Sequence, residues 1–279
     1  MLFRSPGGSP AVVELKPPPG WQQGDDLVLR FDARVPRLPS SDPNDWFFDG
    51  FLPQLQARCL GQGLDPAYYR PSIAAHVTGR LRVPTGWQYE GPGMLHGDGT
   101  IDVDVKARTY AFALGKAFHH RKAEVDGVTV DIAYRSPGFD EIFDTVVKTL
   151  PVFGALFGTY PYKSLTIVET SELQRHGLPG LIAINRPAQT AFNHVQKEWL
   201  NWQHWILAIQ LAGQWFGGAI ASATPDDDWL ITGIAEFATL EALNHVPARF
   251  NLFNAGDGGL RPLSFDYLQV TEIDRKSTR

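Results

Sequence analysis

The chain has 279 residues, of which 43% are hydrophobic and 20% are charged, so it can bury a core and general disorder is excluded. Its formal net charge of −5 provides no electrostatic footprint for nucleic acid and no polybasic patch for a membrane surface. Cys59 is the single cysteine, which excludes an intrachain disulfide and a multi-cysteine zinc site. A single cysteine is compatible with the cytoplasm, and the compartment is left open.

The residues at the two ends of the chain can be encoded by a DNA sequence that is not of natural origin. Leu2–Ser5 and Asp274–Arg279 can each be encoded by one side of a common short-read sequencing adapter. We therefore expect residues 1–5 and 274–279 to be adapter-derived and the chain to be a fragment of a longer protein. Its full length and natural termini are left open on this interpretation.

Short strand-like runs alternate with glycine and proline turns in the first 125 residues. A loop rich in proline, serine and aspartate is expected at Pro36–Asn44. The predicted strands are Leu27–Ala33, Ile73–Val83, Ile101–Val105 and Thr109–Leu114.

Strands and helices mix after residue 125. A turn at Asp126–Gly127 predicts a strand after it, and apolar residues at helical spacing predict long helices. The predicted strands are Val128–Tyr134, Leu165–Val168 and Leu181–Ile184, and the predicted helices are Phe139–Phe157, Phe192–Phe216 and Trp229–Leu243.

The most apolar stretch of the chain is Trp205–Ala221. It is short for a membrane span and contains Gln210 and Gln214, so we expect a buried helix there and no membrane span. The chain also has no G-x-S-x-G, no G-x-x-x-x-G-K-[ST] and no G-x-G-x-x-G motif. These absences disfavour a serine hydrolase, a P-loop nucleotide site and a dinucleotide site.

Two segments carry the most informative motifs. Ile209–Gly217 reads I-Q-L-A-G-Q-W-F-G, and Trp229–Phe237 reads W-L-I-T-G-I-A-E-F. They resemble the zinc aminopeptidases of the alanyl aminopeptidase (gluzincin) family, which typically read H-E-L-A-H-Q-W-F-G and then W-L-N-E-G-F-A-x-[YF]. Phe157–Tyr162 is similar to the family's F-G-x-Y-P-Y segment, and Pro179–Ile182 is similar to the residues after its G-x-M-E-N substrate loop. The resemblance extends over roughly Asp26–Leu243.

This resemblance implies a fold and a domain organisation. The expected fold class is mixed α/β (α+β), with a β-rich N-terminal domain followed by part of a thermolysin-like zincin domain. Residues 6–125 correspond to the C-terminal part of the aminopeptidase β domain, and residues 126–273 to the N-terminal part of the peptidase domain.

The residues that carry the family's chemistry are replaced in this chain. In the family, the two histidines of H-E-x-x-H bind zinc, the glutamate activates water, and a glutamate nineteen positions after the second histidine is the third ligand. The two histidine positions hold Ile209 and Gly213, the general-base position holds Gln210, and the third-ligand position holds Thr232. The resemblance therefore implies that the family's zinc is absent, with no metal ligand and no catalytic residue at these positions.

The substrate-binding loop of the family is also altered. Gly177 stands where the amine-anchoring glutamate of G-x-M-E-N is expected. The residues that we expect to line the former substrate cleft are His176, Gly177, Pro179, Gly180 and Gln214. The family's catalytic tyrosine lies downstream of the third ligand, beyond this sequence.

The remaining histidines do not rebuild a metal site by their spacing. His194 and His204 would lie about 15 Å apart along a helix, which is too far to share a zinc ion. His119 and His120 are adjacent and point in different directions on a strand or a helix.

The functional hypothesis from the sequence is a pseudopeptidase, a non-catalytic aminopeptidase homologue that binds or scaffolds a peptide or a protein. One alternative is a metallo-aminopeptidase that releases N-terminal amino acids with ligands from outside this segment. A second alternative is a structural domain of a larger envelope or transporter-associated protein. No nucleic-acid partner is expected, and the partner itself and the oligomeric state are left open.

Overall fold

The computed structural model describes residues 2–4, 10–12, 19–20, 22, 44–49, 75–107, 110–137, 139–170, 178–185, 207–222 and 227–244, and all statements about structure concern these residues. They contain both strands and helices, so the expected mixed α+β class is confirmed. The strand predicted at Leu27–Ala33 and most of the predicted loop Pro36–Asn44 lie outside the described residues.

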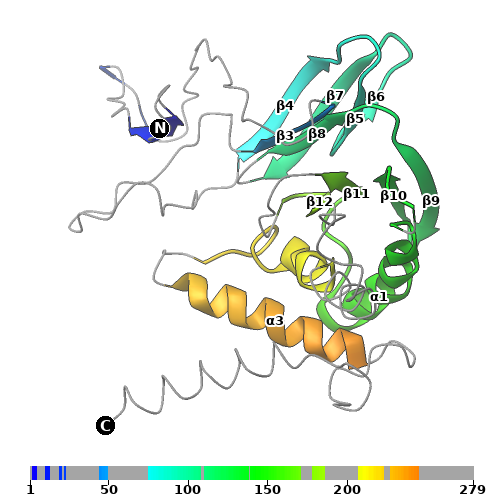
Figure 1. Ribbon diagram of the computed structural model, residues 1–279. Coiled ribbons are helices and arrows are strands. Elements are labelled where there is room, and N and C mark those ends of the chain that lie inside the picture. Colours follow the sequence, from blue (N-terminus) through cyan, green and yellow to red (C-terminus); the bar gives the residue numbers. More distant parts are fainter. Residues whose placement is uncertain are drawn as a thin grey trace.

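The N-terminal half is built from antiparallel sheets, which lie at the top of Figure 1. One sheet has the order β3-β8-β5 and the other has the order β4-β7-β6. Their apolar faces enclose a core that includes Ile101, Tyr110 and Phe112. The bounds are β3 (Asp45–Asp49), β4 (Ala75–Arg82), β5 (Gln88–Glu90), β6 (Met94–Leu95), β7 (Thr100–Ala107) and β8 (Ala111–Gly115), and a short separate pair is formed by β1 (Leu2–Arg4) and β2 (Pro10–Val12).

A further, four-stranded sheet has the order β12-β11-β10-β9. Its strands are β9 (His119–Val125), β10 (Val128–Tyr134), β11 (Ser164–Thr170) and β12 (Leu181–Asn185). β9 and β10 form an antiparallel hairpin, whereas β10, β11 and β12 run parallel. The predicted turn joins the hairpin, with φ of 51° at Asp126 and 78° at Gly127, as a type I′ turn requires.

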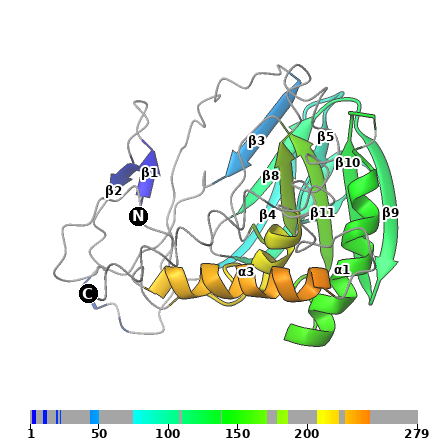
Figure 2. The same cartoon turned by 60° about the horizontal axis from the view of Figure 1, so that its bottom comes forward.

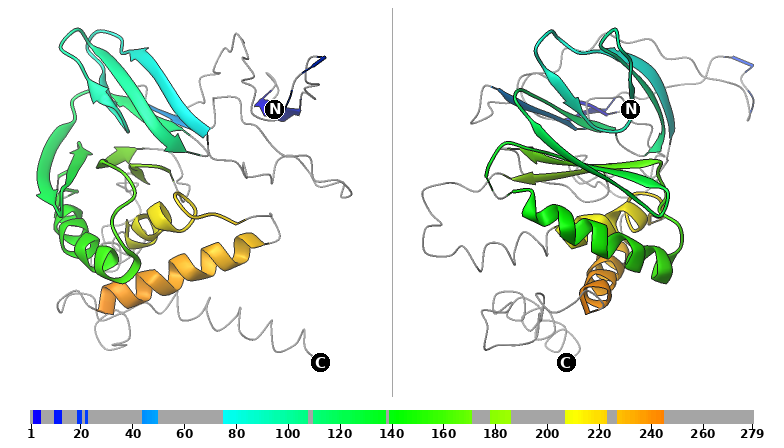
Figure 3. Two further views of the ribbon diagram at one scale, coloured as in Figure 1. Left: turned by 180° about the vertical axis from the view of Figure 1, so that it is seen from behind. Right: turned by 90° about the vertical axis from the view of Figure 1, so that its right-hand side faces the viewer.

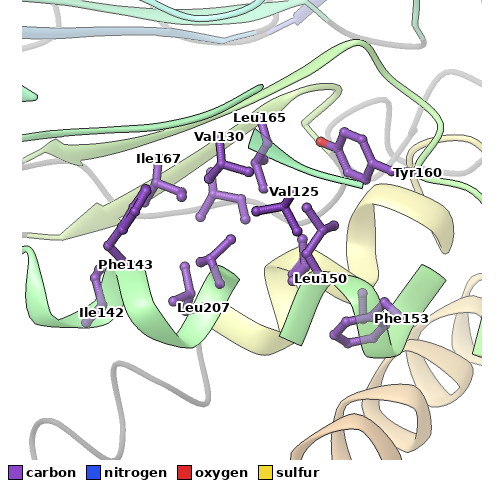
Figure 4. Close-up of a cluster of buried hydrophobic side chains, with 14 of the residues drawn as sticks. Val125, Val130, Ile142, Phe143, Leu150, Phe153, Tyr160, Leu165, Ile167 and Leu207 are labelled. Carbon is purple, nitrogen blue, oxygen red and sulfur yellow. The ribbon is translucent and has the colours of Figure 1, made fainter. Parts of the chain in front are cut away.

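Three helical segments cover one face of the four-stranded sheet, so sheet and helices form successive layers (Figures 1 and 3). They are α1 (Glu141–Phe157), a helix at residues 207–215, and α3 (Asp228–Asn244). The apolar side chains between helices and sheet form the main core, to which Ile132, Phe153 and Leu211 belong (Figure 4). In Figure 2, α3 runs across the front of the molecule and its C-terminal end lies next to α1.

The sequence predictions for these helices agree with the structure where it describes them. The predicted helix Phe192–Phe216 is described only from residue 207, and it is helical from there to residue 215. Gly217 ends it with φ of 114°, and the Gly218 N–H donates to the Gly213 carbonyl 2.9 Å away. A side chain at Gly218 would lie 2.5 Å from the Gln214 carbonyl oxygen, so only glycine fits this terminus.

In the part of the chain that the structure describes, no helix combines the length and the apolar character needed to cross a bilayer.

Candidate functional site

The 207–215 helix carries Ile209, Gln210 and Gly213, three of the four positions that the sequence resemblance assigns to the aminopeptidase chemistry. Every residue from 207 to 215 is buried, with Leu207 and Leu211 completely enclosed by the main core. Ile209 and Gln210 are also buried, and Gly213 contributes no side chain. A helix that is apolar on nearly all sides is typical of a position between a sheet and other helices.

Gln214 links this helix to the segment that precedes β12. Its side-chain Oε1 accepts hydrogen bonds from the Gly180 N–H at 2.9 Å and from the Tyr160 hydroxyl at 3.1 Å. Its Nε2 donates to the Leu178 carbonyl at 3.0 Å and lies 3.4 Å from the Leu181 carbonyl. The side chain is 1% exposed, so these protein groups use its hydrogen-bonding capacity.

The residue beside Gln214 makes a second link to the same region. Trp215 donates from its indole Nε1 to the Gly158 carbonyl at 3.1 Å, and its ring stacks on Phe153 at 5.6 Å between centroids. Gly158 and Tyr160 belong to the F-G-T-Y-P-Y segment. Three segments that carry the resemblance therefore contact one another: the 207–215 helix, the 157–162 segment and the residues before β12. The contacts are hydrogen bonds and ring packing between buried groups.

Three of the five residues predicted to line the cleft are described, and the structure places them together. Pro179 and Gly180 are buried at the start of β12, next to the Gln214 side chain. The Gly180 carbonyl also accepts a hydrogen bond from the Thr166 N–H at 2.9 Å. His176 and Gly177 lie outside the described residues.

Gly180 is a position where a side chain should be costly. Its φ is +68°, and a Cβ would lie 3.1 Å from the Ser164 carbonyl oxygen. We expect Gly180→Ala to lower the free energy of unfolding by about 1–2 kcal/mol, because an L-residue is strained in this backbone conformation. Urea denaturation measures the change. Gly154→Ala is the control, since a Cβ there meets no atom within 4 Å, and an equal loss in both variants would contradict the prediction.

Thr232, which the sequence resemblance predicts at the third-ligand position, is exposed on α3. The buried side of α3 lies next to Thr232 around the helix and packs into the main core through Ala235, Ala238 and Ala242. Small residues on the buried side allow the helix to approach its neighbours closely.

The residues at the four positions that the resemblance assigns to the zinc site do not fit a zinc ion. Ile209 has no lone pair to donate, and Gly213 has no side chain. The Gln210 amide keeps the shape of a glutamate but cannot accept a proton from water. The Thr232 hydroxyl is a poor ligand for an ion that prefers imidazole, thiolate or carboxylate.

A different cluster of metal-type ligands appears where the two halves of the chain meet. Glu90 on β5, His120 on β9 and Asp131 on β10 each place one ligand atom within 4.8 Å of the others. His120 Nδ1 lies 3.1 Å from Asp131 Oδ1, and His120 Nε2 lies 3.5 Å from Glu90 Oε1. Lys122 Nζ lies 3.0 Å from Asp131 Oδ2 on the solvent side.

The charges in this cluster are strongly coupled. Burial raises the pKa of Glu90 to about 7, against the opposing effect of the nearby His120. The hydrogen bond to Asp131 raises the pKa of His120, and the hydrogen bonds from His120 and Lys122 outweigh burial and lower the pKa of Asp131. The pKa values of the two carboxyl groups in the cluster are therefore shifted in opposite directions.

Sequence reasoning missed this cluster because it compared histidines only with one another. The Asp126–Gly127 turn fixes the hairpin register, which places Lys122 opposite Asp131 and His120 two residues along the same strand. The proximity of His120 and Asp131 could therefore have been predicted from the position of this turn. Glu90 belongs to another sheet, and no local signal connects it to the hairpin.

Comparisons with known proteins found similarity at the level of structure. The chain matches no protein-family model and no curated protein. It is similar to the crystal structure of a mutant M1 zinc metallopeptidase from Deinococcus radiodurans, bound to a Tyr-Ser-Ala substrate, with 20% sequence identity and a TM-score of 0.43. The similarity covers 62% of this chain and 41% of that metallopeptidase, so this chain spans less than half of its length.

Proposed function

We propose that this chain is a non-catalytic homologue of the zinc aminopeptidases, a pseudopeptidase that binds or scaffolds a peptide or protein. One contrast supports the proposal. The motif residues retained in the chain, among them Gln214, Trp215 and Tyr160, make structural contacts with one another. The motif positions that have lost the family's residue, Ile209 and Gly213 among them, are those that would hold the metal.

The exposed surface of α3 supports the binding part of the proposal. Trp229 is 73% exposed and Phe237 is 62% exposed, and their spacing along the helix places both on one side of it. Leu230 is exposed on the same side. Large apolar side chains in contact with water are typical of surfaces that another protein covers. On this proposal, residues 6–125 and 126–273 are parts of the two aminopeptidase domains.

The catalytic part of the proposal is tested by assaying a tripeptide with a free amino terminus. We expect no release of the N-terminal amino acid above the uncatalysed rate, with or without added Zn²⁺, because neither a metal ligand nor a general base stands at the family positions. Chelator-sensitive release would contradict the proposal and favour the metallo-aminopeptidase alternative.

The assignment of the four aminopeptidase positions is tested by restoring the zinc ligands and the general base of the family. A variant with Ile209→His, Gln210→Glu, Gly213→His and Thr232→Glu is made in a Glu90→Gln background, so that the Glu90 cluster does not contribute a metal. We expect the restored variant to bind one zinc ion per chain by elemental mass spectrometry and the Glu90→Gln parent to bind none. Zinc in the parent would mean that the ligand positions are wrongly assigned. If the restored variant folds but binds no zinc, the chain does not place these four positions as a zinc aminopeptidase does.

A further inference from the structure

Three strands from different parts of the fold bring an imidazole and two carboxylates together. Glu90 ends β5 of an upper sheet, whereas His120 and Asp131 lie on the β9–β10 hairpin of the four-stranded sheet. In Figure 2, β5, β9 and β10 lie on the same side of the molecule. The three side chains therefore join the two halves of the chain at one point.

The Glu90 carboxylate is the unusual member of this group. It is 4% exposed, and it lies beside His120 across the boundary between the two sheets. Its one ion-pair contact among the described residues is His120 Nε2 at 3.5 Å, which is too long for a strong hydrogen bond. The nearest charged partner of this buried carboxylate is therefore a histidine that it shares with a second carboxylate, which is less counter-charge than burial normally demands.

We propose that Glu90, His120 and Asp131 bind a divalent transition-metal ion of the zinc type. One imidazole nitrogen and two carboxylate oxygens are donors that zinc accepts, with water completing the coordination. Four-coordinate zinc needs donor atoms about 3.3 Å apart. The donor atoms already lie within 4.8 Å of one another. His120 faces the two carboxylates with different ring nitrogens, so its ring, which is 29% exposed, would rotate to bring one nitrogen to the ion.

The ion would add positive charge beside the Glu90 carboxylate, and it would link β5 to the β9–β10 hairpin. This is a structural role, separate from the four aminopeptidase positions on the 207–215 helix and α3. Lys122 opposes it, because its ammonium group lies 3.0 Å from Asp131 Oδ2. The Lys122 side chain is 64% exposed and can swing into solvent when the ion binds.

The test titrates the full chain with Zn²⁺ by calorimetry after chelator treatment, and repeats the titration with Co²⁺ while recording visible absorption. We expect one ion per chain, d–d bands of a Co²⁺ site with nitrogen and oxygen ligands, and a higher melting temperature with Zn²⁺. Glu90→Gln and Asp131→Asn should each weaken binding more than about a hundredfold, beyond the loss typical of an outer-shell group. Lys122→Ala should tighten it about tenfold, because it removes a competing positive charge.

His96→Asn is the matched control. His96 Nε2 lies 2.7 Å from Asp102 Oδ2, so this is another histidine–aspartate pair, but the described residues offer no third ligand within reach. Its zinc affinity should equal that of the unmodified chain. Equal binding in Glu90→Gln and in the unmodified chain, or an equal loss in His96→Asn, would overturn the proposal. Zinc binding that persists in Glu90→Gln would also count against the proposed loss of the aminopeptidase zinc site. If neither the unmodified chain nor any variant binds zinc, only the proposed Glu90–His120–Asp131 site is overturned.

Discussion

Replacing Gln214 by leucine is expected to lower the free energy of unfolding by about 3–5 kcal/mol. The substitution keeps the volume of the side chain approximately but removes every polar atom. The Gly180 N–H and the Tyr160 hydroxyl would lose their acceptor, and the Leu178 carbonyl would lose a donor. All of these groups are buried, and each one left without a partner costs about 1–3 kcal/mol.

Urea denaturation followed by circular dichroism measures this effect. Thr239→Val is the matched control, because Thr239 is also completely buried but its hydroxyl donates only to the Ala235 carbonyl, one turn earlier in the same helix. That carbonyl keeps its helical bond, so the control should change stability by less than about 1 kcal/mol. A small effect of Gln214→Leu would mean that Gln214 does not hold the helix to the start of β12.

The second large effect is the pH dependence that Glu90 imposes on stability. Its pKa rises from 4.5 to about 7 because the carboxyl group is buried, so the folded state keeps this proton to a higher pH than the unfolded state does. Between these values the folded state binds more protons, and stability therefore falls as the pH rises. The raised pKa of His120 acts in the same direction, since its stabilising charge is lost as the pH rises through that pKa. The expected loss attributable to Glu90 is about 2–3 kcal/mol between pH 4.5 and pH 8.

Glu90→Gln should remove most of this slope. We expect it to match the unmodified chain near pH 5 and to be more stable by about 2 kcal/mol at pH 8, because an amide is not ionised there. Urea denaturation from pH 5 to pH 8, with a chelator present, measures both curves. Glu124→Gln is the control on the exposed part of β9, and its curve should run parallel to that of the unmodified chain. An unchanged slope in Glu90→Gln would contradict the prediction.

These two positions show different relations between motif and structure. Gln214 was a candidate for a substrate cleft because the aligned motif retains it, and the structure places its amide among buried backbone groups. Whether it also meets a ligand stays a prediction. Glu90 belonged to no motif, and it acquires its properties from burial beside His120.

Local sequence predicted the elements whose signals lie within one segment. β10 has the predicted bounds Val128–Tyr134, because alternating apolar residues follow a two-residue turn whose conformation glycine favours. α1 begins two residues after its predicted start at Phe139, since the first residues form a turn from the Ser136 carbonyl to the Phe139 N–H. β9 was not predicted, because His119–Glu124 is a polar run that forms a strand only by pairing with β10.

The sequence by itself determined the mixed α+β class and the positions of the main helices, because these depend on local periodicity. It also determined the side-chain chemistry available at the positions that the resemblance assigns to a metal. Only the tertiary structure decided that Gln214, Tyr160 and Gly180 share one buried junction and that Glu90 faces His120. Both arrangements join segments that lie far apart in the chain. Their hydrogen bonds and their burial follow from strand order and helix packing, which no local pattern encodes.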